Sequence, residues 1–542
     1  MSFKKGIGFL VLFMVACSLF VDYNKHFEII KNIEIFTNVY KEINAHYVDE
    51  TDPAKLMKSG IDAMLHQLDP FTNYISEVQI ENYRLVYEGK YNGMGVRAKR
   101  IGDYVTITEV YKDFPADKAG IRVGDQVISV NGLDGKGKES EDLFQIMRGM
   151  PKSEVDLKIA RPGENKPIAV TLVRDEVNIP NVPYSSMIDS ATGYIQLSTF
   201  TENAGRNVRD ALKKLKKDHP SMKGVILDLR DNGGGLLSEA VEVCNVFLPQ
   251  NQLIATTRSK LKEKDQAYHT LGVPEDSELP LVTLINGKSA SASEIVSGCL
   301  QDLDRGVVLG QISYGKGLVQ NTKEVGYNAK VKLTIAKYYI PSGRCIQSVQ
   351  YENGEPVHLP DSLRVPFKTR NGRTVYDGGG VQPDVEIPNA NLPDRVQKIL
   401  DQDYLFNYCT QLFIKKGLPA DPLLFKFTDY QDFKSYLKLH GFDDQHPVKL
   451  KIAELQNLTG SSEYASLMAS LEQLKTQASD LHWKSLDQHQ ELLNHLIEEE
   501  IALRVGYQSA AIQKKMQHDP VVRQAIQVLA DPIRYKKLLA KG

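Results

Sequence analysis

Residues 279–310 read LPLVTLINGKSASASEIVSGCLQDLDRGVVLG. The first apolar run predicts a buried strand, and EIVSGCLQDL after it has the spacing of a helix. Ser291 and Glu294 have the spacing of a capping box, which marks the start of that helix. Asp302, late in the helix, is expected to be structural, either by holding Arg305 or by capping the next loop. RGVVLG predicts a second strand, so the order strand, serine turn, helix and strand indicates an α/β core.

The same alternation extends on both sides of this stretch. Upstream of it come TGYIQLSTF, NAGRNVRDALKKLKKD, KGVILDLRDNGGG and LLSEAVEVCNVFL, and downstream VKLTIAKYYIPSG and VQPDVEIP predict closing strands. A Pro-rich linker, VNIPNVPYSS, precedes the first of these runs. We therefore expect residues 178–390 to form one α/β core with a layered sheet.

The segments that flank this core have different patterns, as expected for a chain of 542 residues, which is too long for a single hydrophobic core. Residues 27–84 have apolar side chains at helical spacing. Residues 85–177 contain short runs such as YVTITEV and QVISVNG between Gly, Asp and Pro clusters, which predict a compact β-rich module. Residues 391–542 return to the helical pattern, and their helices either pack on the core or form a homodimer.

The N-terminus, residues 1–22, has the features of an export signal. Lys4 and Lys5 precede an apolar run over residues 6–21. Because this run is shorter than the ~20 residues that cross a bilayer comfortably, we expect a cleaved signal, with a retained membrane anchor and a buried helix as alternatives. MVAC, which ends at Cys17, also resembles a bacterial lipoprotein cleavage box. The sequence thus predicts a periplasmic protein of the bacterial cell envelope, either free or attached to the membrane.

The overall composition indicates neither a nucleic-acid-binding protein nor a metalloprotein. The net charge is -2 and the charged fraction is 25%, so no basic surface for nucleic acid is expected. The cysteines form no Cys-x-x-Cys pair, which argues against a zinc site or a disulfide framework. We therefore expect no metal and no cofactor. The five cysteines are Cys17, Cys244, Cys299, Cys345 and Cys409.

The serine turn fits two roles. A capping serine alone explains one of its residues. A serine at a strand-to-helix turn also has an exposed hydroxyl, beside backbone N–H groups and a helix dipole that favour a developing oxyanion. The local pattern does not rank Ser289 against Ser291 as a nucleophile.

A nucleophilic serine needs a base, and the candidates are few. His269 and His358 lie in expected loops and in no recognisable triad, and the motif G-x-S-x-G is absent. Lys316, in SYGKGLVQ, lies between two glycines that leave room for a substrate. It can act as a base only when neutral, which burial favours. From the tripeptide alone, a solvated lysine in a Gly-Lys-Gly turn is the favoured interpretation.

The β-rich module resembles a PDZ domain. The resemblance rests on YNGMGV, on DFPADKAGIRVGDQVISVNG and on the helix SEDLFQIMRG. Such a Gly-rich loop before a strand can bind a terminal carboxylate through its N–H groups, while the strand edge pairs with an extended peptide. A simple hairpin is the alternative. The loop consists of Gly93, Met94, Gly95 and Val96. Arg148, in IMRG, is a candidate for coupling peptide binding to activation.

NGKSASASEIVSGCLQDLDRGVVLGQISYGKGLVQ, preceded by GVILDLRDNGGG, closely resembles the C-terminal processing peptidases, or tail-specific proteases. The resemblance covers about residues 35–388. It implies a crotonase-like layered α/β protease core, an inserted PDZ domain and a Ser/Lys dyad. On this sequence it implies Ser291 as nucleophile, Lys316 as general base, Gln320 orienting that lysine, and oxyanion donors at Ala292 and at Gly234 or Gly235.

The resemblance implies an exported serine endopeptidase that needs no cofactor. Its partners would be substrate proteins held by their C-terminal tails in the PDZ domain. The rival from another class is an inactive PDZ scaffold that only binds the tails of envelope proteins. A crotonase-like acyl-CoA enzyme would share the oxyanion loop, but it would not need Lys316 and would not be exported.

Overall fold

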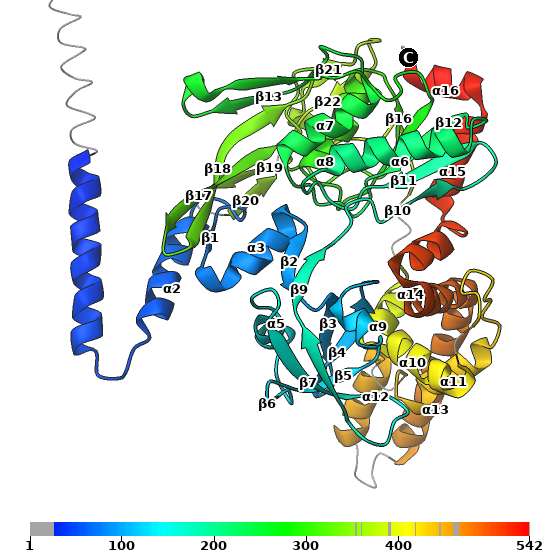
Figure 1. Ribbon diagram of the computed structural model, residues 1–542. Helices are drawn as coiled ribbons and strands as arrows, with labels where there is room; N and C mark the ends of the chain where they lie inside the picture. Colours follow the sequence, from blue (N-terminus) through cyan, green and yellow to red (C-terminus); the bar gives the residue numbers. More distant parts are fainter. Residues whose placement is uncertain are drawn as a thin grey trace, which may run out of the picture. The chain divides into compact units, whose positions relative to one another are not determined.

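The computed structural model describes residues 26–352, 355–358, 360–388, 392–417, 419–443, 446–458 and 465–540 (Figure 1). The predicted export signal, residues 1–22, lies outside these ranges. The chain divides into a small unit, residues 1–74, 322–333 and 351–356, and a large unit with the remaining residues. No helix among the described residues is both long and apolar enough to cross a bilayer.

The small unit begins with helical residues 26–46, followed by helix α2 (Pro53–His66). Asp52 caps α2, since its side chain accepts hydrogen bonds from the N–H groups of Ala54 and Lys55. Pro53 occupies the first turn, where its missing N–H costs nothing. The helical character expected for this part of the chain is therefore present.

The large unit contains a six-stranded sheet in the order β10–β11–β12–β15–β16–β23. Neighbouring strands are parallel from β11 onward, and β10 pairs antiparallel with β11. Every residue of β12 and β15 is buried, as expected for parallel strands covered on both faces. The strands are β10 (Tyr184–Met187), β11 (Thr192–Gln196), β12 (Gly224–Asp228), β15 (Leu281–Ile285), β16 (Val307–Gly310) and β23 (Val385–Glu386).

Helices pack against this sheet in two separate buried clusters. One cluster joins it to α6 (Ala204–Asp218), α7 (Leu237–Phe247) and α8 (Ala292–Asp302). The other joins it to α15 (Pro520–Ala530) and α16 (Pro532–Leu539). The Tyr535 hydroxyl of α16 also bonds the backbone of Leu281 at the start of β15. The last helices of the chain therefore pack on the core, which was one of the two roles expected for the C-terminal region.

The PDZ module is built on the sheet β3–β4–β5–β7–β8, with β6 paired to β5. Its buried core comes from alternate positions of these strands and from α5. The antiparallel pair of β2 and β9 joins the start and the end of the module. The elements are β2 (Lys90–Gly93), β3 (Val96–Ile101), β4 (Tyr104–Val110), α4 (Pro115–Lys118), β5 (Gln126–Val130), β6 (Leu133–Asp134), α5 (Ser140–Met147), β7 (Glu154–Ala160), β8 (Ile168–Val173) and β9 (Asp175–Asn178).

The described part of the C-terminal helical region contains helices α9 to α14, and all of them except α12 contribute to a buried core rich in aromatic side chains. Polar contacts join this region to the PDZ module: Lys99 pairs with Asp403, and the Tyr507 hydroxyl donates to Asp117 at 2.8 Å. The helices are α9 (Asp394–Asp401), α10 (Tyr404–Lys416), α11 (Tyr430–Leu439), α12 (Pro447–Leu458), α13 (Ala465–Asp487) and α14 (Gln490–Met516).

The remaining elements in the described ranges are one α-helix and several strands outside the two sheets already described. α3 (Ile80–Tyr87) precedes the PDZ module, and β13 (Leu253–Ser259) pairs with β14 (Gln266–His269). The others are β1 (Asn73–Ile75), β17 (Leu318–Gly326), β18 (Ala329–Tyr339), β19 (Val349–Glu352), β20 (Glu355–His358), β21 (Pro366–Lys368) and β22 (Thr374–Tyr376). The fold is thus the expected layered α/β core with an inserted PDZ domain and helical regions at both ends.

Candidate active site

Three serines follow β15, and the structure gives them different surroundings. Ser289 and Ser293 are fully buried. The Ser289 hydroxyl donates to the Leu229 carbonyl and the Ser293 hydroxyl to the Asn232 carbonyl, each at 2.8 Å. Ser291 is only half-buried. Of the three, Ser291 is therefore the one that a substrate can reach, which the local sequence pattern could not decide.

Ser291 has a backbone conformation that residues other than glycine rarely adopt, with φ 55° and ψ -112°. Such strain is often found at functional sites, where the surrounding structure holds it in place. Ser291 is also the N-cap residue of α8. The N–H of the next residue, Ala292, donates to no group in the described part of the chain. This N–H and the positive end of the α8 dipole can both stabilise negative charge beside Ser291.

The carboxylate of Glu294 joins the loops of Ser291 and Lys316. Its Oε2 accepts the Ser291 N–H at 2.8 Å and the Lys316 N–H at 2.9 Å. Its Oε1 accepts the Gly315 N–H at 2.7 Å and the Ser313 hydroxyl at 2.5 Å. The predicted nucleophile and the predicted base are thus held by one oxygen atom.

Glu294 is fully buried, and burial raises its pKa to about 7 even though its four hydrogen bonds act in the opposite direction. A carboxylate that only accepts hydrogen bonds fits this site, because all four neighbours are donors. The sequence analysis assigned Glu294 to helix capping alone. Nothing in the sequence connected Glu294 with Lys316, because the rest of α8 and the strand β16 separate them in the chain.

Tyr338 provides a second link between the two loops. Its buried hydroxyl lies 3.2 Å from the Ser291 carbonyl oxygen and 2.8 Å from that of Lys316. Gln320, predicted to orient Lys316, is half-buried in β17, and its amide donates to the Thr334 hydroxyl at 3.2 Å. The orienting role of Gln320 stays a prediction.

The glycine loop after β12 lies against the serine turn. A Cβ atom on Gly234 would be 2.9 Å from Ser291 Cβ and 3.0 Å from the Ala292 nitrogen, so glycine leaves this space open. Its φ of +99° also favours glycine. However, the Gly234 N–H already donates to the Asn232 side chain at 2.9 Å.

Gly235 is the better candidate for the second oxyanion donor. Its N–H makes no hydrogen bond within the described ranges. The carbonyl oxygen of the preceding residue, Gly234, accepts the Phe200 N–H, and this hydrogen bond anchors the loop to the core. Of the two glycines, Gly235 is therefore the one whose N–H is available in the described ranges, and its role as oxyanion donor beside Ala292 stays a prediction. Gly234 leaves room beside the nucleophile.

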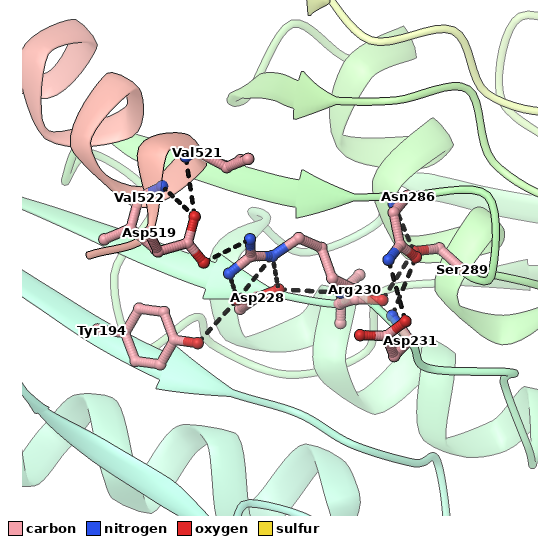
Figure 2. Close-up of polar contacts among 10 residues, drawn as sticks. Tyr194, Asp228, Arg230, Asp231, Asn286, Ser289, Asp519, Val521 and Val522 are labelled. Carbon is pink, nitrogen blue, oxygen red and sulfur yellow. Dashed lines mark hydrogen bonds and ion pairs between the residues drawn. The ribbon is translucent and has the colours of Figure 1, made fainter. Parts of the chain in front are cut away.

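A buried cluster of charged side chains fixes the start of the glycine loop (Figure 2). Arg230 donates to Asp228 through Nε at 3.0 Å, and the Tyr194 hydroxyl donates to the same carboxylate at 2.7 Å. Burial opposes ionisation of Asp228, but the Arg230 guanidinium lowers its pKa below the ordinary value. On its other side Arg230 pairs with Asp519, at the start of α15, at 2.7 Å. Sequence analysis missed this cluster because Tyr194 and Asp519 are distant in the chain from Asp228 and Arg230.

The predicted carboxylate-binding loop of the PDZ module borders a cavity of about 580 Å³. Met94 and Val96 line this cavity, whereas Gly93 pairs with Asp175 of β9. Gly95 turns the chain with φ +83°. The Val96 N–H donates to the Tyr91 hydroxyl at 3.2 Å, so in this state that donor is engaged.

The lining of this cavity combines apolar side chains with two arginines, Arg97 and Arg148, and a few polar residues. Phe144 and Met147 of α5 line it beside Met94. The Arg148 guanidinium lies 5.5 Å from the centre of the Tyr91 ring and 5.4 Å from that of Phe144. Such a site suits an apolar side chain with an anionic group beside it.

Comparison with known families assigns the segments just described. Residues 191–354 match the model of peptidase family S41, residues 106–161 match the PDZ domain, and residues 396–529 match a C-terminal helical domain described as that of a probable PDZ-protease. The chain therefore belongs to peptidase family S41, as a serine peptidase that carries a PDZ domain.

Named relatives narrow this class to carboxy-terminal processing. The chain is 33% identical to the carboxy-terminal-processing protease of Bartonella bacilliformis over 349 residues, 64% of this chain and 80% of the relative. It is 29% identical to the carboxy-terminal processing protease CtpA of Bacillus subtilis, over 68% of this chain and 78% of the relative. Among solved structures, the photosystem II D1 C-terminal processing protease matches 68% of this chain and 96% of its own, with 25% identity and a TM-score of 0.37.

Proposed function

We propose that this chain is an exported endopeptidase that holds substrate proteins by their C-terminal tails and cleaves them with a dyad of Ser291 and Lys316. The observation that carries the proposal is the shared contact with Glu294, whose Oε2 accepts the N–H groups of both residues. This contact keeps the two loops in one arrangement, as a nucleophile and its base require.

The reaction follows from the groups around Ser291. Neutral Lys316 takes the proton of the Ser291 hydroxyl while Oγ attacks the scissile carbonyl, and Gln320 orients the lysine. The N–H groups of Ala292 and Gly235 stabilise the tetrahedral oxyanion. The protonated lysine then gives its proton to the leaving amine. Neutral Lys316 next activates a water molecule, which hydrolyses the acyl-enzyme and releases Ser291.

The PDZ cavity supplies the tail recognition. An extended tail would add to the free edge of β3, place its last side chain against Met94 and Phe144, and place its carboxylate near Arg148. The names of the relatives, which refer to carboxy-terminal processing, support this direction.

Location and assembly belong to the same proposal. Residues 1–22 have the pattern of an export signal, and we propose the cell envelope as the site of action, with the N-terminus cleaved, anchored or lipidated at Cys17. Mass spectrometry of the mature N-terminus distinguishes these three forms. Light scattering on the purified chain tests the homodimer, which would appear as twice the chain mass of 60.8 kDa.

The central experiment compares cleavage by wild type, Ser291→Ala and Lys316→Ala. The substrate is a folded reporter protein with an apolar C-terminal tail, either with a free carboxylate or amidated. We expect cleavage only by wild type, and faster cleavage of the free tail. Lys288→Ala is the matched control, because this lysine lies three residues from Ser291 with 81% of its side chain exposed.

Two results would overturn the proposal. A folded Ser291→Ala protein that still cleaves the reporter would exclude this nucleophile. Wild type that binds the free tail without cleaving it would instead be the tail-binding scaffold.

A further inference from the structure

We propose that Asp519, in the C-terminal helical region, is a positioning residue for the oxyanion loop and acts through Arg230. This inference rests on the proposed peptidase function, because its effect on kcat can be measured only if the chain is a peptidase. It assigns a role in the reaction to a residue outside the S41 segment, residues 191–354.

The two carboxylate oxygens of Asp519 make different contacts. Oδ1 accepts the N–H groups of Val521 and Val522 at 2.8 and 3.2 Å, which caps α15. Oδ2 pairs with Arg230 at 2.7 Å (Figure 2). The side chain is 6% exposed, so this ion pair is shielded from solvent and salt.

Arg230 lies between two carboxylates, and each holds a different part of its guanidinium. Asp228 accepts from Nε and Nη2, and Asp519 pairs with Nη1. If Asp519 loses its charge, one side of a guanidinium that is only 16% exposed loses its anionic partner. Asp228 would still hold Nε and Nη2, but Nη1 would be left without its acceptor, and a buried donor without an acceptor is costly. The guanidinium can lower this cost by shifting Nη1 toward water or toward another acceptor.

Movement of Arg230 would reach the reacting groups through short backbone steps. Arg230 is four residues before Gly234, where an added Cβ would lie 2.9 Å from the Ser291 Cβ. Between them, the Asn232 carbonyl accepts the Ala290 N–H and the Ser293 hydroxyl. The glycine loop and the serine turn are therefore fastened to each other, and a shift in the first changes the second.

The position of Asp519 is itself fixed by packing on the core sheet. Val522, Ala525 and Val528 of α15 are buried in one cluster with Ile226 of β12 and Val282 of β15. Asp519 precedes this helix directly. The helix thus sets the place of the carboxylate, and the carboxylate sets the place of Arg230.

Asp531 offers a matched control within the same region. It also stands before a proline and caps a helix, α16, by accepting the N–H groups of Ile533 and Arg534 at 3.1 and 3.0 Å. Unlike Asp519, it takes part in no ion pair in the part of the chain that is described. Asparagine is as good a cap as aspartate, so the same substitution keeps both caps and removes only one ion pair.

The test uses the full-length chain with Asp519→Asn, Asp531→Asn and wild type. We expect Asp519→Asn to lower kcat by about 10- to 100-fold, because small displacements of reacting groups have effects of this size. KM and the Kd of a fluorescent tail peptide should stay at wild-type values, and Asp531→Asn should leave kcat unchanged. The folded fraction, measured by near-UV circular dichroism, corrects each kcat for any unfolded protein.

Two further measurements separate positioning from mere stabilisation. If Asp519 acts through Arg230, Asp519→Asn should have little further effect on the residual kcat of Arg230→Met. Hydrogen exchange of residues 229–236 should be faster in Asp519→Asn than in Asp531→Asn, and this readout does not depend on catalysis. Equal kcat and equal exchange in the two asparagine variants would overturn the inference, whereas an inactive wild type with the expected exchange difference would overturn only the peptidase function.

Discussion

Replacing Glu294 by glutamine tests how the two halves of the candidate dyad are held together. The carboxylate accepts four hydrogen bonds, two on each oxygen. In glutamine one oxygen becomes an NH2 group, so two buried donors lose their acceptor whichever way the amide lies. Each unsatisfied donor costs about 1–3 kcal/mol, so we expect Glu294→Gln to lower the free energy of unfolding by about 4 kcal/mol.

The effect on catalysis should exceed the effect on folding. If the NH2 group takes the place of Oε2, the N–H groups of Ser291 and Lys316 lose their acceptor, and if it takes the place of Oε1, the Gly315 N–H and the Ser313 hydroxyl lose theirs. In either orientation the loop of Lys316 loses a contact with the carboxyl group that also holds Ser291. A displacement of about 1 Å between reacting groups can cost about a hundredfold in rate. We therefore expect kcat of the folded variant to fall by about that factor, with little change in KM.

The assay has two parts. Urea unfolding at pH 8.5 is monitored by far-UV circular dichroism, and activity is measured as cleavage of a reporter protein with an apolar C-terminal tail. Glu239→Gln is the matched control, since Glu239 also bridges two backbone N–H groups, those of Asn203 and Gly205, at 3.1 and 3.0 Å. This control should lose stability and keep its kcat. Wild-type kcat in Glu294→Gln, once corrected for the folded fraction, would refute the reasoning.

The pH dependence of stability gives an independent check on Glu294. Burial raises its pKa from 4.5 to about 7, so between these values the folded chain binds more protons than the unfolded chain. The resulting stabilisation is complete below pH 4.5 and is lost as the pH rises through 7, which amounts to about 3 kcal/mol. Burial raises the pKa of Glu499 to about 7 as well, so Glu294→Gln keeps the loss that this second group causes. Unfolding across this range should therefore show a loss in Glu294→Gln that is smaller than the wild-type loss by about 3 kcal/mol.

Three other substitutions test neighbouring parts of the site. Gly234→Ala should fold but lose most of its kcat, because the new methyl would lie 2.9 Å from the Cβ of the nucleophile. Gly233→Ala should keep its activity, because the space around that position is open. Tyr338→Phe removes the hydroxyl shared by the two loop carbonyls, and a loss of about 1.4 kcal/mol in transition-state stabilisation would lower kcat about tenfold. Asp302→Asn breaks a buried ion pair with Arg344 at 2.9 Å and should cost about 3–5 kcal/mol in urea unfolding, with kcat per folded molecule unchanged.

The arrangement of the core could be predicted because its strands are buried on both faces. LPLVTLI and GVILD are nearly continuous apolar runs, and such runs between helical patterns identify parallel strands. The sequence could not decide whether the C-terminal helices pack on the core or form a homodimer, because an amphipathic pattern does not identify the surface that a helix covers. α15 and α16 pack on the core sheet. Asp302 shows a similar limit. Its structural role was expected, but its partner is Arg344, whereas Arg305 donates to backbone carbonyls such as that of Phe247.

In the candidate site, too, the local contacts could be predicted from the sequence and the contacts between distant residues could not. The spacing of Ser291 and Glu294 correctly placed the helix start, since the Glu294 carboxylate accepts the Ser291 N–H as a capping box requires. That local explanation was complete in itself, and it therefore hid the second task of Glu294, which is to accept the Lys316 N–H. Distant pairings leave no periodic pattern in a single sequence. The residues that position a reaction are thus the hardest to read from sequence when each already has a sufficient local role, as Asp519 also has at the start of α15.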